Sequence, residues 1–270
     1  MKPRLITFLF ALALLPASAQ NTSDEPPPHI DVSRFPVAKV VDEVIVPVPS
    51  EVFGVLDKLG SPNWHEVLRN TKTNRMEDRP QIALLLGTVI AEGFIAVEAQ
   101  EGEAVKRIGT SVLNLAAAIG VRKAVLERSK SIIDAADKKD WVKVRMELDG
   151  ALQDVKQAMN EIESEQLAQL VSLGGWLRGT EALTSVVQKS YSPDSAELLH
   201  QPALLDYFQE RLDHMEPRLR NGLVAKIRTR LPEIKPLIED KTGTISQASV
   251  EKVHGITEDL VKSIIAKGGE

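Results

Sequence analysis

The chain contains no cysteine among its 270 residues. Without thiols it cannot form disulfides, thiolate-bound metal sites or covalently attached haem. Buried apolar surface must therefore stabilise the fold, and the length is sufficient for one or two domains with a sizeable core.

Aromatic residues are scarce as well, at 4% of the chain. Leu, Ala, Glu, Lys and Gln are plentiful, and these residues favour helix over sheet. The composition predicts an all-α protein, a bundle or array of about eight to ten helices. One stretch departs from this pattern, because residues 37–48 are rich in Val and Ile. Since Pro47 lies within it and Pro49 follows, this stretch is at best an edge strand or an extended strap across the helices, and we favour the strap.

The motifs of several large enzyme classes are also missing. The sequence has no G-x-S-x-G elbow, no phosphate loop, no G-x-G-x-x-G and no H-E-x-x-H. These absences weaken the hypothesis of an enzyme without removing it, and no cofactor is expected. The net charge of −5 also disfavours nucleic acid as a partner, because phosphates repel an acidic surface.

The N-terminus has the order of an export signal. Lys2 and Arg4 precede an apolar run over 5–15, and Ala17-Ser18-Ala19 offers a cleavage site for small side chains. The run of about eleven residues is too short to span a bilayer as a stable helix. We therefore expect a signal peptide over 1–19 and a periplasmic or secreted mature chain. Its net charge would be −7, because Lys2 and Arg4 are removed from a total of −5.

The expected mature chain divides into two parts. Residues 20–36 are polar and proline-rich, so we expect a disordered leader. Residues 37–270 are expected to form a single helical domain, with a possible subdivision near 191–202. From 80 to 100 the chain is apolar on nearly every face, which predicts a central helix surrounded by others. Its apolar run ends after about ten residues at Glu92, so no stable membrane span is expected after signal cleavage.

Further helices follow from hydrophobic spacing and from breaks. Apolar residues at gaps of three and four predict a helix over 141–162, and Gly120 marks either a break or a close helix contact within 102–137. Another helix is expected from 165 to 187, with three glycines inside it. Beyond residue 191 prolines punctuate shorter helices, and the last helix is expected around 250–265.

The glycines of the 165–187 helix predict a close helix crossing. Gly175 and Gly179 lie one turn apart and would face the small residues Gly87 and Ala91 of the central helix. In that arrangement Arg178 would reach Glu92, whose charge otherwise lies on an apolar helix. A charge in such a place must be paired, neutralised or turned to water.

Two interpretations of this crossing remain open. One is a ligand-binding site made of Glu92, Trp176, Arg178 and Glu181, a polar pocket with Trp176 as its apolar wall. The other is a core ion pair with tight packing around it, and we weigh this structural interpretation above the first.

Two histidines suggest a different chemistry. Glu197-x-x-His200 and Glu251-x-x-His254 each place a carboxylate and an imidazole on one helix face, as in di-iron helical bundles. These four residues are the candidate metal ligands of an alternative function, a carboxylate and histidine metal-dependent enzyme of the helical-bundle type. Pro202 and Gly255 argue against it, because both weaken the helices concerned.

Basic residues gather between positions 218 and 230. They spread around the helix circumference, so we interpret them as a solvated face, with binding to an anionic lipid or polymer as the alternative. Taken together, the sequence predicts an exported, non-catalytic helical binding or scaffolding protein of the cell envelope. Its partner would be an unknown envelope protein or a small molecule.

Overall fold

The computed structural model describes the backbone of residues 39–41 and 44–46, and residues 62–69, 77–220, 222–239 and 243–266. The expected signal peptide over 1–19, the leader over 20–36 and the start of the strap therefore lie outside the described residues. Their assignments stay predictions.

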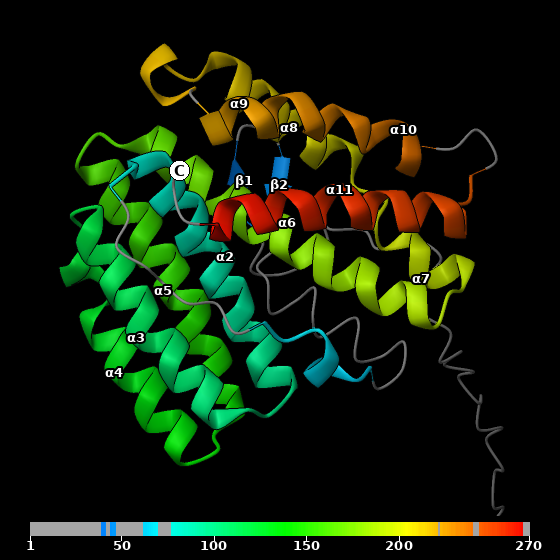
Figure 1. Ribbon diagram of the computed structural model, residues 1–270. Helices are drawn as coiled ribbons and strands as arrows, with labels where there is room; N and C mark the ends of the chain where they lie inside the picture. The colour runs from blue at the N-terminus through cyan, green and yellow to red at the C-terminus, as the bar shows by residue number, and fades with distance from the viewer. Residues whose placement is uncertain are drawn as a thin grey trace, which may run out of the picture.

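The fold is all-α, as predicted, and its helices form an array in two groups joined by α6 (Figure 1). Eight α-helices of nine or more residues lie in the described part of the chain. The first group is α2 (Arg79–Glu98), α3 (Gly102–Ala118), α4 (Arg122–Asp137), α5 (Trp141–Glu161) and α6 (Glu165–Lys189). The second group comprises α7 (Pro193–Glu197), α8 (Pro202–His214), α9 (Gly222–Arg230), α10 (Lys235–Ile238) and α11 (Gln247–Ile265).

Helix α2 is the central helix that the sequence predicts. Asp78 caps its N-terminus by accepting a hydrogen bond from the Gln81 backbone N–H at 3.1 Å, and Pro80 lies in its first turn. Every residue from Pro80 to Val97 is buried. Among the described residues α2 is the helix long and apolar enough to span a membrane, but its whole apolar window is buried by other protein elements. The core helix of a water-soluble protein has the same composition.

The helices of the first group are joined by turns of three residues each. The middle residue of every turn has a positive φ: 55° at Gln100, 92° at Gly120, 56° at Lys139 and 55° at Glu163. This left-handed conformation ends one helix and lets the chain reverse into the next. The break predicted at Gly120 is thereby confirmed.

Three elements of the second group begin at prolines, as expected from proline's fixed φ and missing N–H. Pro193 opens α7, Pro202 opens α8 and Pro217 opens the 3₁₀ turn η3 (Pro217–Leu219). Another 3₁₀ turn, η4 (Leu231–Glu233), connects α9 to α10. Helix α11 packs along α6, and the Gln81 side chain of α2 donates to the Ile264 and Ala266 carbonyls at its end, at 3.2 and 2.8 Å.

Within the stretch expected to be a strap, β1 (Lys39–Val41) pairs antiparallel with β2 (Val44–Val46), with Lys39 opposite Val46. The other residues of 37–48 lie outside the described residues, so the strap itself stays a prediction. A further described segment, 62–69, contains the 3₁₀ turn η2 (Trp64–Glu66) and precedes α2.

Candidate functional site

Helices α2 and α6 cross with their backbones in contact. A Cβ atom on Gly87 would overlap the Val171 carbonyl oxygen, and one on Gly174 would overlap the Leu84 carbonyl oxygen. Gly175 would meet Gly87 at an ordinary 3.5 Å. The predicted docking of these helices is confirmed. The role given to Gly179 is wrong, because no described atom outside the local helix lies within 4 Å of its ideal Cβ.

The crossing carries the predicted ion pair. Arg178 Nε donates to Glu92 Oε2 at 2.6 Å, and each side chain is only 1% exposed. The same guanidinium donates from Nη1 to Glu181 Oε2 at 3.1 Å and from Nη2 to the Val67 carbonyl at 2.7 Å. The charge of Glu92 is therefore paired with a guanidinium inside the core.

Arg69 completes this arrangement and was missed by the sequence reasoning. Its backbone N–H donates to Glu92 Oε1, and its guanidinium donates to Glu181 Oε1. Nη2 also lies 3.7 Å from Glu258 of α11. Arg69 is 23 residues from Glu92 and 112 from Glu181, and it lies outside every helical pattern. No sequence signal pointed to it.

Arg69, Glu92, Arg178 and Glu181 form what we call the charge cluster. It holds two positive and two negative groups, and both oxygens of each carboxylate accept a hydrogen bond from within the chain. Buried charges are tolerated when they are paired and hydrogen-bonded in this way. The cluster fixes segment 62–69 against α2 and α6, because two of its partners are main-chain groups of that segment.

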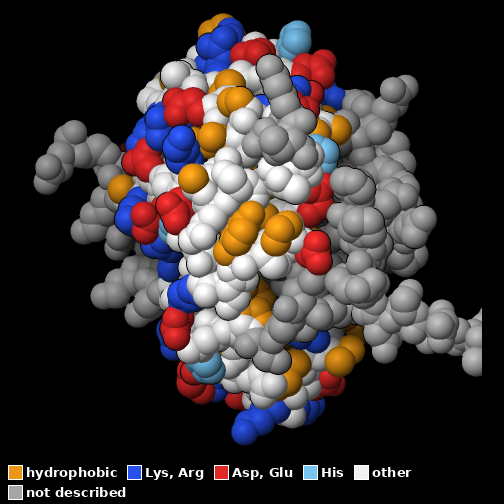
Figure 2. All heavy atoms as spheres, turned by 90° about the vertical axis from the view of Figure 1, so that its right-hand side faces the viewer, with side chains coloured by type: hydrophobic (Ala, Val, Ile, Leu, Met, Phe, Trp, Pro, Cys, Tyr) orange, Lys and Arg blue, Asp and Glu red, His pale blue; other side chains and the backbone are white. Residues whose placement is uncertain are grey.

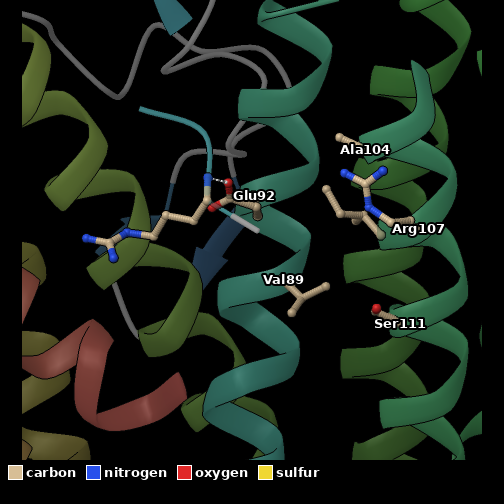
Figure 3. A pocket seen from close by; sticks show the side chains of 7 residues that line it. Val89, Glu92, Ala104, Arg107 and Ser111 are labelled. Carbon is tan, nitrogen blue, oxygen red and sulfur yellow. Dashed lines mark hydrogen bonds between the residues drawn. The ribbon is translucent and has the colours of Figure 1, made fainter. Parts of the chain in front are cut away.

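A small cavity adjoins the cluster between α2 and α3 (Figure 3). Its volume is about 20 Å³, and the side chains lining it include Val89, Glu92, Arg107 and Ser111. That volume is enough for about one water molecule and far below the roughly 300 Å³ at which sites for organic ligands begin. The cavity is thus too small to be a site for an organic ligand.

Trp176 does not join the charge cluster. Its indole Nε1 donates to Gln201 at 3.1 Å, and its ring lies 5.6 Å from that of Phe208 in α8. Two residues along an α-helix correspond to a rotation of roughly 200°, so Trp176 and Arg178 point to opposite sides of α6. The expected apolar wall of a pocket is instead part of the α6–α8 contact.

The four candidate metal ligands do not come together in one group. His200 Nδ1 lies 3.3 Å from Glu197 in the same short stretch, and His254 Nδ1 lies 3.1 Å from the Thr184 hydroxyl. Glu251 is exposed and accepts a hydrogen bond from Gln247. Over the described residues, no group of three or more His, Asp or Glu side chains is arranged to hold a metal ion.

The basic residues between 218 and 230 are matched by acidic side chains. Arg228 contacts Asp213 at 2.6 Å, Arg230 contacts Glu233 at 2.7 Å and Lys226 contacts Asp259 at 2.9 Å. On the face shown in Figure 2, Lys and Arg side chains also lie interspersed with Asp and Glu. This pairing supports the solvated face over the binding of an anionic surface.

Ser249-x-x-Lys252 in α11 has the spacing of a serine–lysine acyl-transfer motif. In the structure the Ser249 hydroxyl lies 3.0 Å from that of Ser246, which caps the helix, and Lys252 is exposed. The described contacts of Ser249 are therefore those of a helix terminus.

Comparison of the chain with models of protein families, with curated proteins and with solved structures found no match. The inference of function therefore rests on the charge cluster and on the segment that it holds.

Proposed function

We propose that this chain is an exported, non-catalytic binding or scaffolding protein of the cell envelope. The observation that carries the proposal is the closure of the charge cluster, in which each oxygen of both carboxylates accepts a hydrogen bond from a donor of the same chain. Glu92, Arg178 and Glu181 act here as groups that hold a polypeptide segment.

This closure favours binding over catalysis for a chemical reason. A general acid or base must reach the proton of a substrate, directly or through one water molecule. Glu92 is 1% exposed and Glu181 4% exposed, and both are held in ion pairs with arginines. The same groups are well suited to orient a chain segment rigidly.

The export part of the proposal is tested by expressing the full chain in a Gram-negative host and fractionating the cells. We expect the protein in the periplasm or medium, with an intact mass that lacks residues 1–19. Full-length protein retained in the cytoplasm would contradict export.

The binding part is tested by native mass spectrometry of protein purified from its own envelope without chelator. We expect retained subunits or small molecules, and no stoichiometric metal. Iron, manganese or zinc bound in stoichiometric amount and lost in His200→Ala or His254→Ala would instead support the metal-dependent enzyme.

A further inference from the structure

We infer that the surfaces of α2, α6 and α11 around the charge cluster form a peptide-binding site, which segment 62–69 occupies in the same chain. This inference rests on the proposed binding function and names its partner class. The partner is a protein segment with a tryptophan, an aliphatic residue three positions later and an arginine two positions after that, as in Trp64, Val67 and Arg69.

The cluster recognises the main chain of the segment. Arg178 Nη2 donates to the Val67 carbonyl at 2.7 Å, and Glu92 accepts the Arg69 backbone N–H. The buried donor Arg178 and the buried acceptor Glu92 thus bind the carbonyl of Val67 and the N–H of Arg69, two main-chain groups two residues apart. Any polypeptide can present these groups, and main-chain hydrogen bonds of this kind supply affinity without sequence preference.

Three side chains supply the specificity. Trp64 is 4% exposed and Val67 is 7% exposed, and both belong to the apolar core. The Arg69 guanidinium lies between Glu181 of α6 and Glu258 of α11. Tryptophan and arginine are the residues that most often dominate the binding energy of protein interfaces. The acidic pair selects a basic side chain at the last position.

Side chains of α2 and α6 hold the main chain of the segment, and the segment's own side chains Trp64 and Val67 are buried in the core. Its described internal backbone hydrogen bonds are those of the single turn η2, such as Val67 N–H to the Trp64 carbonyl at 3.1 Å. It therefore resembles a bound peptide more than a helix of the bundle. Because a tethered segment has an effective concentration in the millimolar range, a free peptide competes poorly while the segment stays in place. The occupied state is thus autoinhibited.

The test uses the mature chain and a fluorescein-labelled synthetic peptide with the sequence of residues 62–69. In the double variant Trp64→Ala/Arg69→Ala the internal segment loses its anchors. Fluorescence anisotropy should then show binding about tenfold or more tighter than to the wild type, because the intramolecular competitor is weakened. A peptide with glutamate in place of the arginine should lose about tenfold in affinity for the double variant, since Glu181 and Glu258 repel it.

Two controls separate binding from misfolding. Circular dichroism must show the wild-type helical signal and a cooperative thermal transition for the variant. If the double variant does not fold, Arg69→Ala alone takes its place, with an expected gain of about threefold because only one anchor is lost. In the folded background, Glu258→Gln should weaken peptide binding about twofold, whereas Glu251→Gln on the exposed side of α11 should leave it unchanged.

Three outcomes would overturn the inference. They are no peptide binding by a folded variant, equal binding of the glutamate peptide, and a wild-type dimer that exchanges segment 62–69 and so assigns the site to a second copy. The proposed function fails separately, because it is tested by export and by retained partners in the native envelope. If the protein retains partners from the envelope but its folded variant does not bind the peptide, the proposed function is supported and the peptide-binding site is refuted.

Discussion

Two arginines in this molecule make the same kind of interaction in different surroundings. Arg178 bridges Glu92 and Glu181 at the α2–α6 crossing, where its side chain is 1% exposed. Arg128 of α4 bridges Glu147 and Asp154 of α5 at 3.0 and 2.9 Å, and its side chain is 38% exposed. Each guanidinium has two carboxylate partners, and the main difference between the two arginines is burial, although Arg178 also donates to the Val67 carbonyl.

Because of this difference in burial, the stability of the fold should depend strongly on the Arg178 network and only weakly on the Arg128 network. In the core, a charge that loses its partner is left in a medium of low dielectric constant and cannot be rehydrated without opening the fold. At the surface, water and salt ions replace the partner at little cost. The two regions should therefore differ in how much each depends on its arginine.

The largest expected effect is that of Arg178→Ala. This change leaves two buried carboxylates short of donors, so the free energy of unfolding should fall by about 3–5 kcal/mol. The matched variant Arg128→Ala should cost no more than about 1 kcal/mol after solvent screening is allowed for. Urea unfolding at pH 7 measures both values. Equal losses in the two variants would show that burial does not distinguish the networks.

The next effect concerns glycines beside each arginine network. Gly87→Ala should cost about 3 kcal/mol, because the new methyl group meets the Val171 backbone, which cannot move without separating the helices. Gly150→Ala places a methyl group only 2.5 Å from the Arg128 guanidinium carbon, which is the end of a flexible side chain. The cost of displacing the Arg128 side chain is offset by the gain in helix propensity of about 1 kcal/mol. Gly150→Ala should therefore leave the free energy of unfolding nearly unchanged. Thermal unfolding of both proteins checks the difference, and a neutral Gly87→Ala would refute the close crossing.

A smaller effect of opposite sign is expected at Gly179. This residue lies inside α6, and no described atom outside its local helix lies near its ideal Cβ position. Gly179→Ala should raise the free energy of unfolding by about 0.5–1 kcal/mol, because alanine favours helix and restricts the unfolded chain. Urea unfolding measures the gain. A loss of stability would mean that a contact at Gly179 exists after all.

The same contrast explains how much could be predicted from the sequence. A run that is apolar on nearly every face located α2, and hydrophobic spacing located α5 and α6. The pairing of Glu92 with Arg178 could be predicted across 86 residues, because small residues on both helices indicated a crossing and the charge of Glu92 required a partner there. Arg69 could not be found, since its partners are brought together only by the packing of distant elements.

Turns show a second limit of sequence patterns. Gly120 indicated a break or a close helix contact, and in the structure it is a left-handed residue at a break, a conformation that glycine adopts without steric cost. Gln100, Lys139 and Glu163 adopt the same conformation at equivalent positions, although their side chains disfavour it. Tertiary packing of the helices overrides local preference there. Trp176 shows the related error of assigning a residue to a site by proximity in sequence, because two helix positions rotate it away from Arg178 by roughly 200°, slightly more than half a turn.

The smallest expected effect depends on pH and concerns Glu147. Burial alone would raise the pKa of this carboxyl, but hydrogen bonds from Arg128 and Ser131 and the Arg128 charge together hold its pKa below the ordinary value. A carboxyl whose folded-state pKa is lowered stabilises the fold above its unfolded-state pKa of about 4.3. That contribution is lost as the pH falls through the folded-state value.

Glu147→Gln should therefore lower the free energy of unfolding by about 0.5 kcal/mol at pH 7 and by the same amount at pH 5.5. At pH 3 the wild type and the variant should approach each other, because the wild-type carboxyl becomes protonated and loses its charge interaction with Arg128. Urea unfolding at these three pH values measures the difference. Glu127→Gln is the matched control on α4, where the carboxyl is 81% exposed and pairs with Lys130. Glu127→Gln removes the same charge and should change the free energy of unfolding little at any pH. If both variants show a similar pH profile, the loss of stability in Glu147→Gln is due to net charge and not to the Arg128 network.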